Sequence, residues 1–371
     1  MTEHTNREGQ GMERETAVWP WRLALTLVIL VWPLIWIGGL VTTYDAGMSV
    51  PDWPNTYGYN LLLYPLETWL VGPFDLLIEH GHRLLATVVG IVSIAFLATA
   101  ARAKSRNQVP AGVVWLAGVV LAAVIGQGVL GGLRVVLDAR TLAMVHGCTG
   151  PLFFMLCVVA ACVTGSGWDR ESLLQAYRTT SDSRATSGPP GKTPGLFWPV
   201  VLVALAACQL ILGAQLRHAL PTTSPTAFAH TAATHVTLGL VVLVWTLAVF
   251  WRMRRCGDLT LSRPGSWLLL CVVSQIGLGI ATWIVNYGYP AMLGFLPGSQ
   301  SYLLASKNVW DSVVVTGHVA VGSLILGIGT QLSLRVARRR WVLTRQIESG
   351  DRVAVAASPV KGDGTPVMVP A

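Results

Sequence analysis

Eight long apolar segments constrain the fold of this 371-residue chain more than any other feature. Each is close to the ~20 residues that a helix needs to cross the hydrocarbon core of a bilayer. Because water is absent there, the backbone groups of each segment must pair with one another, as they do in a helix. The sequence therefore predicts an all-α membrane protein with eight transmembrane helices. We place them at residues 23–42, 80–101, 111–133, 142–164, 197–216, 230–251, 266–286 and 312–334.

The composition excludes an ordinary soluble domain. Hydrophobic residues make up 53% of the chain and charged residues only 12%, whereas soluble domains carry about 25% charged residues. Basic residues at helix ends account for the net charge of +8. We therefore expect membrane lipid around the protein and no nucleic-acid partner.

Basic residues alternate between successive loops. The loop at 43–79 has no Lys or Arg, whereas the loops after the second, fourth and sixth segments and the tail after the eighth are rich in Arg. Positive charge is retained on the cytoplasmic side of a membrane. We therefore expect both termini in the cytoplasm and the protein in the cell (inner) membrane.

The two halves of the chain resemble each other. Each half carries histidine in its second and fourth segments, and a Gln-x-x-Leu-Gly pattern recurs at 127–131, 209–213 and 275–279. We predict two pseudo-repeated four-helix bundles in the same orientation, because four crossings return the chain to its starting side. The predicted parts are a disordered N-terminus (1–22), the two bundles (23–164 and 197–334), a cytoplasmic linker between them (165–196) and a basic cytoplasmic tail (335–371).

Ionisable residues gather where the second segment begins. Glu79, His80, His82 and Arg83 stand almost side by side, and charges at membrane depth are expensive and usually kept for a function. Glu79 precedes His82 by three positions, so both can face one cavity. There Glu79 would accept a proton or orient a bound group; the alternative is an interfacial carboxylate paired with Arg83.

Histidines near the ends of three further segments point to a metal-bound ring. Neutral imidazole is the usual axial ligand of haem iron, and two helices of a bundle can each present one to a porphyrin. We predict that these histidines act in pairs that bind iron porphyrin. The candidates are His82, His146, His318 and either His235 or His230. Small residues four positions on would make room for the ring, at Ala86, Gly150, Gly239 and Gly322.

The third ligand is open between two residues. His235 has a small residue four positions later, whereas His230 lies closer in depth to His82, and we favour His235. Hydrogen-bonded core histidines, a proton relay and a zinc site are the other uses of such residues. None of the six cysteines forms a Cys-x-x-Cys pair, which argues against zinc.

Two features belong to the outer face. Arg134 is basic there, against the charge rule, and would bind a haem propionate as a bidentate donor or extend toward the interface. The outer loop is stiffened by Pro51 and Pro54, whose ring fixes the backbone. We expect this loop to cover a site.

Several of these stretches resemble the haem A synthase family. Gly38–Thr42 with Ala46–Pro54 resembles its first-loop signature, and Glu79–Arg83 resembles its Glu-x-x-His-Arg motif. Leu130–Val135 followed by Ala143–Gly147 resembles the third-to-fourth-span region, and Leu278–Gly288 fits the seventh span. The resemblance covers most of residues 23–335.

This resemblance implies an enzyme that oxidises the C8 methyl of haem O to a formyl group, giving haem A for terminal oxidases. His82 and His146 would ligate the substrate haem O, with Glu79 and His82 as catalytic residues. His318 with His235 or His230 would ligate a haem b that relays electrons. The implied partners are haem O synthase (the farnesyltransferase that makes the substrate), cytochrome oxidase assembly and an unidentified electron donor.

The sequence departs from the family pattern in two places. Some bacterial members carry a cysteine pair in the first outer loop, and residues 43–79 contain no cysteine. The arginine expected after the ligand of the second half is also missing, since Val236 follows His235 and Thr231 follows His230.

Two other functions are compatible with paired histidines in a membrane. A b-type cytochrome that only transfers electrons would share the pairs but would not need Glu79 beside one of them. A two-bundle transporter would need broken helices and charges at mid-membrane depth, whereas the ionisable residues here gather at helix ends.

Overall fold

The computed structural model describes residues 2–168, 194–220, 222–290, 294–295 and 309–348, and these residues contain no β-strand. Eight of the described helices are long and apolar enough to cross a membrane, as predicted. Most of the predicted linker, 169–193, and the end of the predicted tail, 349–371, lie outside the described residues. The long helices are α1 (Thr2–Thr43), α3 (Phe74–Ser105), α4 (Ala111–Val136), α5 (Arg140–Thr164), α7 (Phe197–Arg217), α8 (Pro225–Arg255), α9 (Leu259–Tyr287) and α10 (Val309–Glu348). The short helices are η1 (Ala46–Met48), α2 (Leu66–Leu70) and η2 (Ser166–Trp168).

Capping residues fix where several helices begin. Pro110 stands immediately before α4, where its missing N–H removes no intrahelical bond. The hydroxyl of Ser224 accepts a hydrogen bond from a first-turn N–H of α8 at 3.2 Å, and the carboxylate of Asp258 accepts one in α9 at 2.8 Å. Each side chain satisfies a donor that the helix leaves unpaired.

All eight long helices extend past their predicted limits, and α1 and α10 extend furthest. The segment 1–22 was expected to be disordered, but α1 is helical from Thr2. The last span was expected to end at residue 334, but α10 continues to Glu348. Apolar runs mark only the part of a helix that crosses lipid. The continuation of α10 is rich in arginine, whose high helix propensity extends the hydrogen-bonded helix outside the apolar run.

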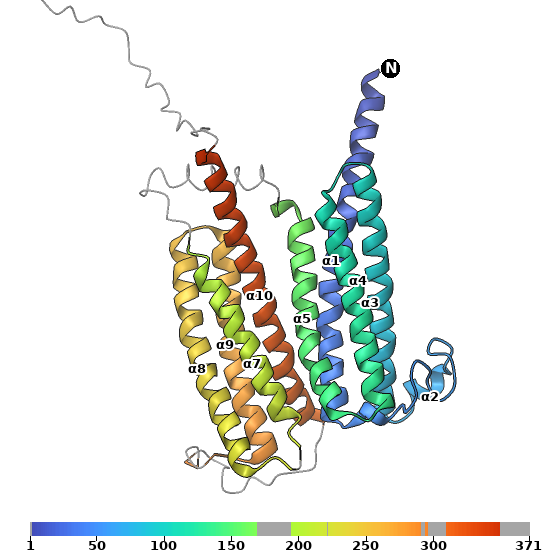
Figure 1. The fold of residues 1–371 in the computed structure, drawn as a ribbon, viewed down its shortest axis with the longest axis vertical. Helices are drawn as coiled ribbons and strands as arrows, with labels where there is room; N and C mark the ends of the chain where they lie inside the picture. The colour runs from blue at the N-terminus through green and yellow to red at the C-terminus, as the bar shows by residue number, and fades with distance from the viewer. Residues whose placement is uncertain (1, 169–193, 221, 291–293, 296–308, 349–371) are drawn as a thin grey trace, which may run out of the picture.

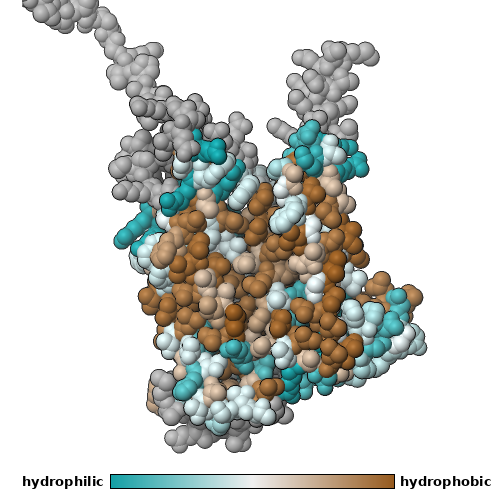
Figure 2. All heavy atoms as spheres, in the orientation of Figure 1, coloured by the Kyte–Doolittle hydropathy of each residue, from teal (hydrophilic) through white to brown (hydrophobic). Residues whose placement is uncertain are grey.

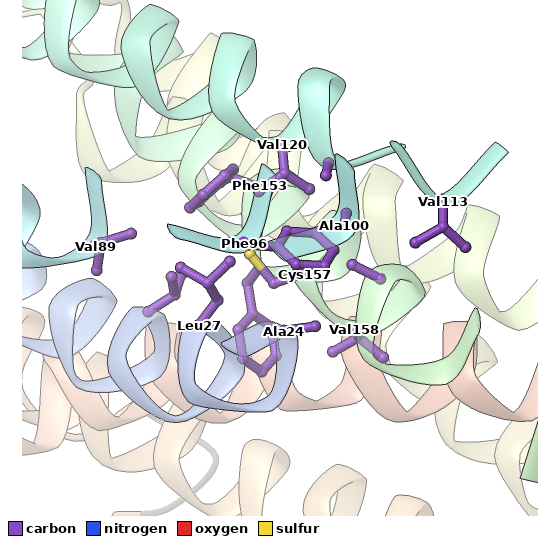
Figure 3. Close-up of a cluster of buried hydrophobic side chains, with 14 residues drawn as sticks. Ala24, Leu27, Val89, Phe96, Ala100, Val113, Val120, Phe153, Cys157 and Val158 are labelled. Carbon is purple, nitrogen blue, oxygen red and sulfur yellow. The ribbon is translucent and has the colours of Figure 1, made fainter. Parts of the chain in front are cut away.

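The helices pack as two groups of four. Helices α1, α3, α4 and α5 contact one another around the first core, and α7, α8, α9 and α10 around the second (Figure 1). The first core includes Leu27, Phe96 and Cys157, which come from three different helices (Figure 3). The second includes Leu268 and Leu326.

Helix α10 joins the two groups, because it also packs on α1 and α5. The indole N–H of Trp32 donates to the backbone oxygen of Ala320 at 3.1 Å. A Cβ added at Gly327 would lie only 2.7 Å from the ring of Phe154. The two groups therefore meet backbone to side chain, with little room between them.

The outer surface of the helices suits lipid. Figure 2 shows an apolar band around the middle of the molecule, with hydrophilic residues toward both ends. Large apolar side chains such as Ile91, Trp115 and Val244 are more than half exposed. The start of α1 and the end of α10 lie at the same end, and the loop between α1 and α3 lies at the other, which we call the loop end (Figure 1).

Candidate functional site

Four of the predicted histidines meet in two pairs, one inside each bundle. The ring centroids of His82 (α3) and His146 (α5) are 6.4 Å apart. Those of His235 (α8) and His318 (α10) are 6.3 Å apart. All four side chains are half-buried, whereas His230 is exposed. The structure therefore brings His235, and not His230, to His318.

The spacing of each pair suits a metal between two imidazoles. With a metal–nitrogen bond of about 2 Å and about 1 Å from that nitrogen to its ring centre, imidazoles on opposite sides of one iron have centroids about 6 Å apart. The observed separations of 6.4 and 6.3 Å agree with this. Two aromatic rings in direct edge contact fall in the same range, so the surroundings of each ring must distinguish the two cases.

A glycine of the neighbouring helix faces each imidazole of the first pair. A Cβ added at Gly38 in α1 would lie 2.9 Å from Cε1 of His82, and one at Gly131 in α4 would lie 3.2 Å from Cε1 of His146. Carbon atoms in contact are normally about 3.5–4.0 Å apart. Neither position therefore accepts a side chain without moving the ring.

The second pair has the same contact. A Cβ at Gly213 in α7 would lie 3.2 Å from Cε1 of His235, and one at Gly279 in α9 would lie 3.1 Å from Cε1 of His318. In all four cases the next nearest ring atom is Nδ1. Each ring therefore presents the same edge, formed by Cε1 and Nδ1, to the backbone of a neighbouring helix.

A backbone carbonyl lies on that edge of each ring. Nδ1 of His318 is 3.2 Å from the oxygen of Gln275, one turn before Gly279. The carbonyls one turn before the other three glycines face the other imidazoles; they belong to Leu34, Gln127 and Gln209. Within the described residues, the buried Nδ1 atoms of those three rings form no hydrogen bond of full geometry.

The glycine contacts and the carbonyls at Nδ1 indicate whether these residues fit an iron porphyrin. The glycines form a cradle that any Cβ would fill. Because Nδ1 is turned to a helix carbonyl, Nε2 is the nitrogen left for iron, and a carbonyl at Nδ1 selects that tautomer. The residues present fit a porphyrin with two axial histidines in each bundle.

Glu79 lies one turn before His82 on α3 and forms two ion pairs. Its side chain is only 2% exposed, and its carboxylate lies 3.1 Å from Nε of Arg83 and 3.2 Å from Nη2 of Arg134. Two guanidinium groups offset the desolvation of one buried carboxylate. The pair with Arg83 is the alternative weighed from the sequence, and the structure adds Arg134 from α4.

Arg83 also fastens the outer loop to the first bundle. Its guanidinium donates to three backbone oxygens of the loop, those of Val50, Asp52 and Asn55. The indole of Trp53 lies against Gly132 of α4 and leaves no room for a Cβ there. The loop at 44–60 therefore docks where Glu79 is buried.

Asp52 closes a turn inside that loop. Its carboxylate accepts hydrogen bonds from the backbone N–H groups of Tyr57 and Gly58, each at 2.8 Å. Burial alone would raise the pKa of this carboxyl, but the two hydrogen bonds and the nearby charge of Arg83 hold the pKa below its ordinary value. The carboxylate therefore stays ionised and bonded well into the acidic range.

His80 contacts the outer loop and does not belong to the pair of His82 and His146. It is buried, its Nδ1 lies 3.2 Å from the hydroxyl oxygen of Thr56, and its ring packs between Tyr64 and Trp69. The offset of two residues from His82 turns it to another face of α3.

Two features of the site were not predicted. Three of the four cradle glycines end the Gln-x-x-Leu-Gly patterns, which were noticed as a repeat but not connected to the histidines. The other feature is Arg217 at the end of α7, which reaches across to α1.

Comparison with known proteins agrees with this site. The sequence model of the cytochrome oxidase assembly protein family, COX15-CtaA, matches residues 21–232, more than half of the chain. The chain belongs to this family. The chain is also similar to a heme A synthase of Dinoroseobacter shibae, with 26% identity over an alignment 330 residues long; the match covers 72% of this chain and 79% of that protein. The predicted relation to haem A synthases is thereby confirmed, and no solved structure gives a significant match.

Proposed function

We propose that this protein is a haem A synthase, a membrane oxidoreductase that converts the C8 methyl of haem O into a formyl group. The observation that carries the proposal is the pair of His82 and His146 at axial-ligand spacing, with a buried carboxylate one turn away. The family and the similarity to a heme A synthase support it.

In the first bundle, His82 and His146 would hold the iron of the substrate haem O. The oxidation needs an external co-substrate, which we propose is O2: one methyl group, two O2, four electrons and four protons would give one formyl group and three waters. Glu79 would accept a proton released at the methyl, and Arg83 and Arg134 would keep its carboxylate in position. Arg134 retains N–H groups beyond those at Glu79 with which to bind a propionate. The docked outer loop would exclude water from this end.

In the second bundle, His235 and His318 would hold haem b, with His230 outside the pair. Bound haem b would supply one-electron transfer. The donor of those electrons is a separate partner. We further propose that haem O synthase supplies the substrate to this protein.

We also propose that the bundles at 23–164 and 197–334 are pseudo-repeats in the cell (inner) membrane, with both termini, the linker at 165–196 and the tail at 335–371 in the cytoplasm. The glycine–histidine contacts recur in the same order along both bundles, which supports a repeat. The arginine-rich loops support the orientation.

The test is the product formed from haem O. Wild-type protein and Glu79→Gln are expressed in membranes that make haem O, and the extracted haems are separated by chromatography. Wild type is expected to yield haem A, whereas Glu79→Gln is expected to retain bound haem and to leave haem O unconverted. Glu67→Gln, an exposed carboxylate in α2, is the matched control. Haem A formation by Glu79→Gln at the wild-type level would exclude the role of Glu79, and bound haem without conversion in wild type would favour a cytochrome.

A further inference from the structure

Arg217 places a guanidinium at the contact between the two bundles. It is the last residue of α7, in the second bundle. Its Nη2 donates to the backbone oxygen of Gly39 at 2.7 Å and to the hydroxyl oxygen of Thr43 at 2.6 Å, both in α1 of the first bundle. The side chain is partly buried there.

These two bonds leave the cation incompletely satisfied. A guanidinium has five N–H donors, and the two bonds use only those on Nη2. No carboxylate among the described residues forms an ion pair with Arg217. The C-terminal end of α1 carries only about half a negative charge. Among the described residues, Arg217 therefore keeps N–H donors with which it could bind an anion.

The place of Arg217 relative to the second pair repeats that of Arg134 relative to the first. Arg134 lies about one turn beyond Gly131, which faces His146, and its charge acts on His82 and His146. Arg217 lies about one turn beyond Gly213, which faces His235, and its charge acts on His318. Arg134 has Glu79 as its carboxylate, whereas Arg217 has none of this kind.

Other basic groups gather at the same end. Arg217, Arg134 and Arg140 all act on His218. Burial, followed by these three charges, lowers the pKa of His218 to about 4, so this imidazole is neutral at pH 7. Arginines at the loop end run against the usual retention of positive charge at the cytoplasmic side. A bound ligand that brings its own negative charge would balance them.

We propose that Arg217 binds a carboxylate of the porphyrin that His235 and His318 hold. This inference rests on the proposed function, because it requires a porphyrin at the second pair. The ligand class is a propionate carboxylate, which a planar guanidinium can bind through two parallel N–H groups. Arg217 is then a cofactor-binding residue that also links the second site to α1.

The experiment compares Arg217→Gln and Arg217→Lys with wild type in the purified, haem-loaded protein. Arg254→Gln, which removes an exposed arginine at the opposite end of the second bundle, is the matched control. Spectroelectrochemical titration gives the midpoint potential of each haem, and transfer to an acceptor protein gives the rate of haem loss. Arg217→Gln is expected to lower one midpoint, since a nearby positive charge favours the added electron. It should also speed loss of that haem about tenfold or more. Arg217→Lys should restore part of both effects.

Two further measurements separate the possible failures. His318→Ala should abolish the haem signal that Arg217→Gln changes; if it removes no haem, the proposed function of the second pair fails. Reconstitution with iron protoporphyrin dimethyl ester removes the carboxylates, so wild type and Arg217→Gln should then lose haem at equal rates. If Arg217→Gln lowers thermal stability but leaves both midpoints and both loss rates unchanged, Arg217 only ties α7 to α1 and the inference is overturned.

Discussion

Glycine at positions 38, 131, 213 and 279 lets each imidazole approach a helix backbone, and this contact sets the direction of its Nε2 atom. A packed interior transmits a small displacement to its neighbours instead of absorbing it. A single methyl group at one of these positions would therefore displace a histidine of a pair without changing any histidine itself.

The substitution Gly38→Ala tests this cradle. Its Cβ would meet Cε1 of His82 at 2.9 Å, so the ring must move. Overpacking of this kind costs about 1–3 kcal/mol, and we expect about tenfold weaker haem binding at the first pair. The measurement is the haem content and the low-spin absorption spectrum. Gly128→Ala, where no atom lies within 4 Å of the added Cβ, is the control; an equal loss in both variants would contradict the cradle.

The histidines were predictable from the sequence, but their glycines were not. An imidazole in an apolar helix stands out because few groups of that kind are placed in lipid. A glycine in the same helix is ordinary, and its partner lies on another helix, so only tertiary contact identifies it. The choice between His230 and His235 stayed open for the same reason. Depth in the membrane favoured His230, and the small residue four positions later favoured His235. The position of α10 brings His235, and not His230, to His318.

At the scale of elements, the outer loop is held by a few polar contacts together with a small apolar cluster of Val41, Ala46 and Ile78. Arg83 and Trp53 attach it to α3 and α4, and Asp52 closes its internal turn. The sequence predicted a covering loop from its prolines. It did not show that Arg83 would bind the loop backbone, since an arginine beside a carboxylate is sufficiently explained by an ion pair.

Acid should release this loop. The pKa of Asp52 is held below its ordinary value in the docked loop. Its contribution to docking is therefore complete above the ordinary value of about 3.9 and is lost as the pH falls through the lowered pKa. We expect protection of residues 44–60 from neutral pH to about pH 4 and loss of protection below that.

Pepsin cleavage within 44–60 over an acidic pH series measures this release. Asp52→Asn is expected to increase cleavage and to weaken its dependence on pH. Asp45→Asn, an exposed carboxylate of the same loop, should behave as wild type. A loop that remains protected to the same low pH in Asp52→Asn would show that Asp52 does not hold it.

At the scale of the whole molecule, the charge pattern predicts an orientation that the packing leaves undetermined. The start of α1 and the end of α10 share one end of the bundle (Figure 1). The basic residues at the ends of α3, α8 and α10 lie at that end, and the loop between α1 and α3, which has no Lys or Arg, lies at the other. The number of spans and the limits of their apolar runs followed from the sequence. In lipid, which holds no water, each backbone N–H and C=O group must form a hydrogen bond within the protein, and a long apolar segment can do this only as a helix.

Reporter fusions test this orientation. Alkaline phosphatase is expected to be active when inserted near Tyr59 and inactive when fused after Glu348, with the reverse for a fluorescent protein that folds only in the cytoplasm. Activity of alkaline phosphatase after Glu348 would place the C-terminus outside.

The contact between the bundles should be sensitive to volume at Gly327. A leucine there would meet the ring of Phe154, only 2.7 Å from the position of its Cβ. We expect Gly327→Leu to lower the free energy of unfolding by about 1–3 kcal/mol, measured by thermal unfolding in detergent. Gly277→Leu, at a lipid-facing glycine with open space, is the control, and equal stability of the two variants would argue against tight contact.

Two adjacent glycines of α1 face opposite bundles. Gly38 lies against His82, while Gly39 lies against Thr316, two residues before His318. The backbone of α1 at this point therefore contacts both His82 and α10, the helix that carries His318. A displacement of this turn of α1 would therefore act on His82 on one side and on the helix beside His318 on the other, which couples the two bundles mechanically.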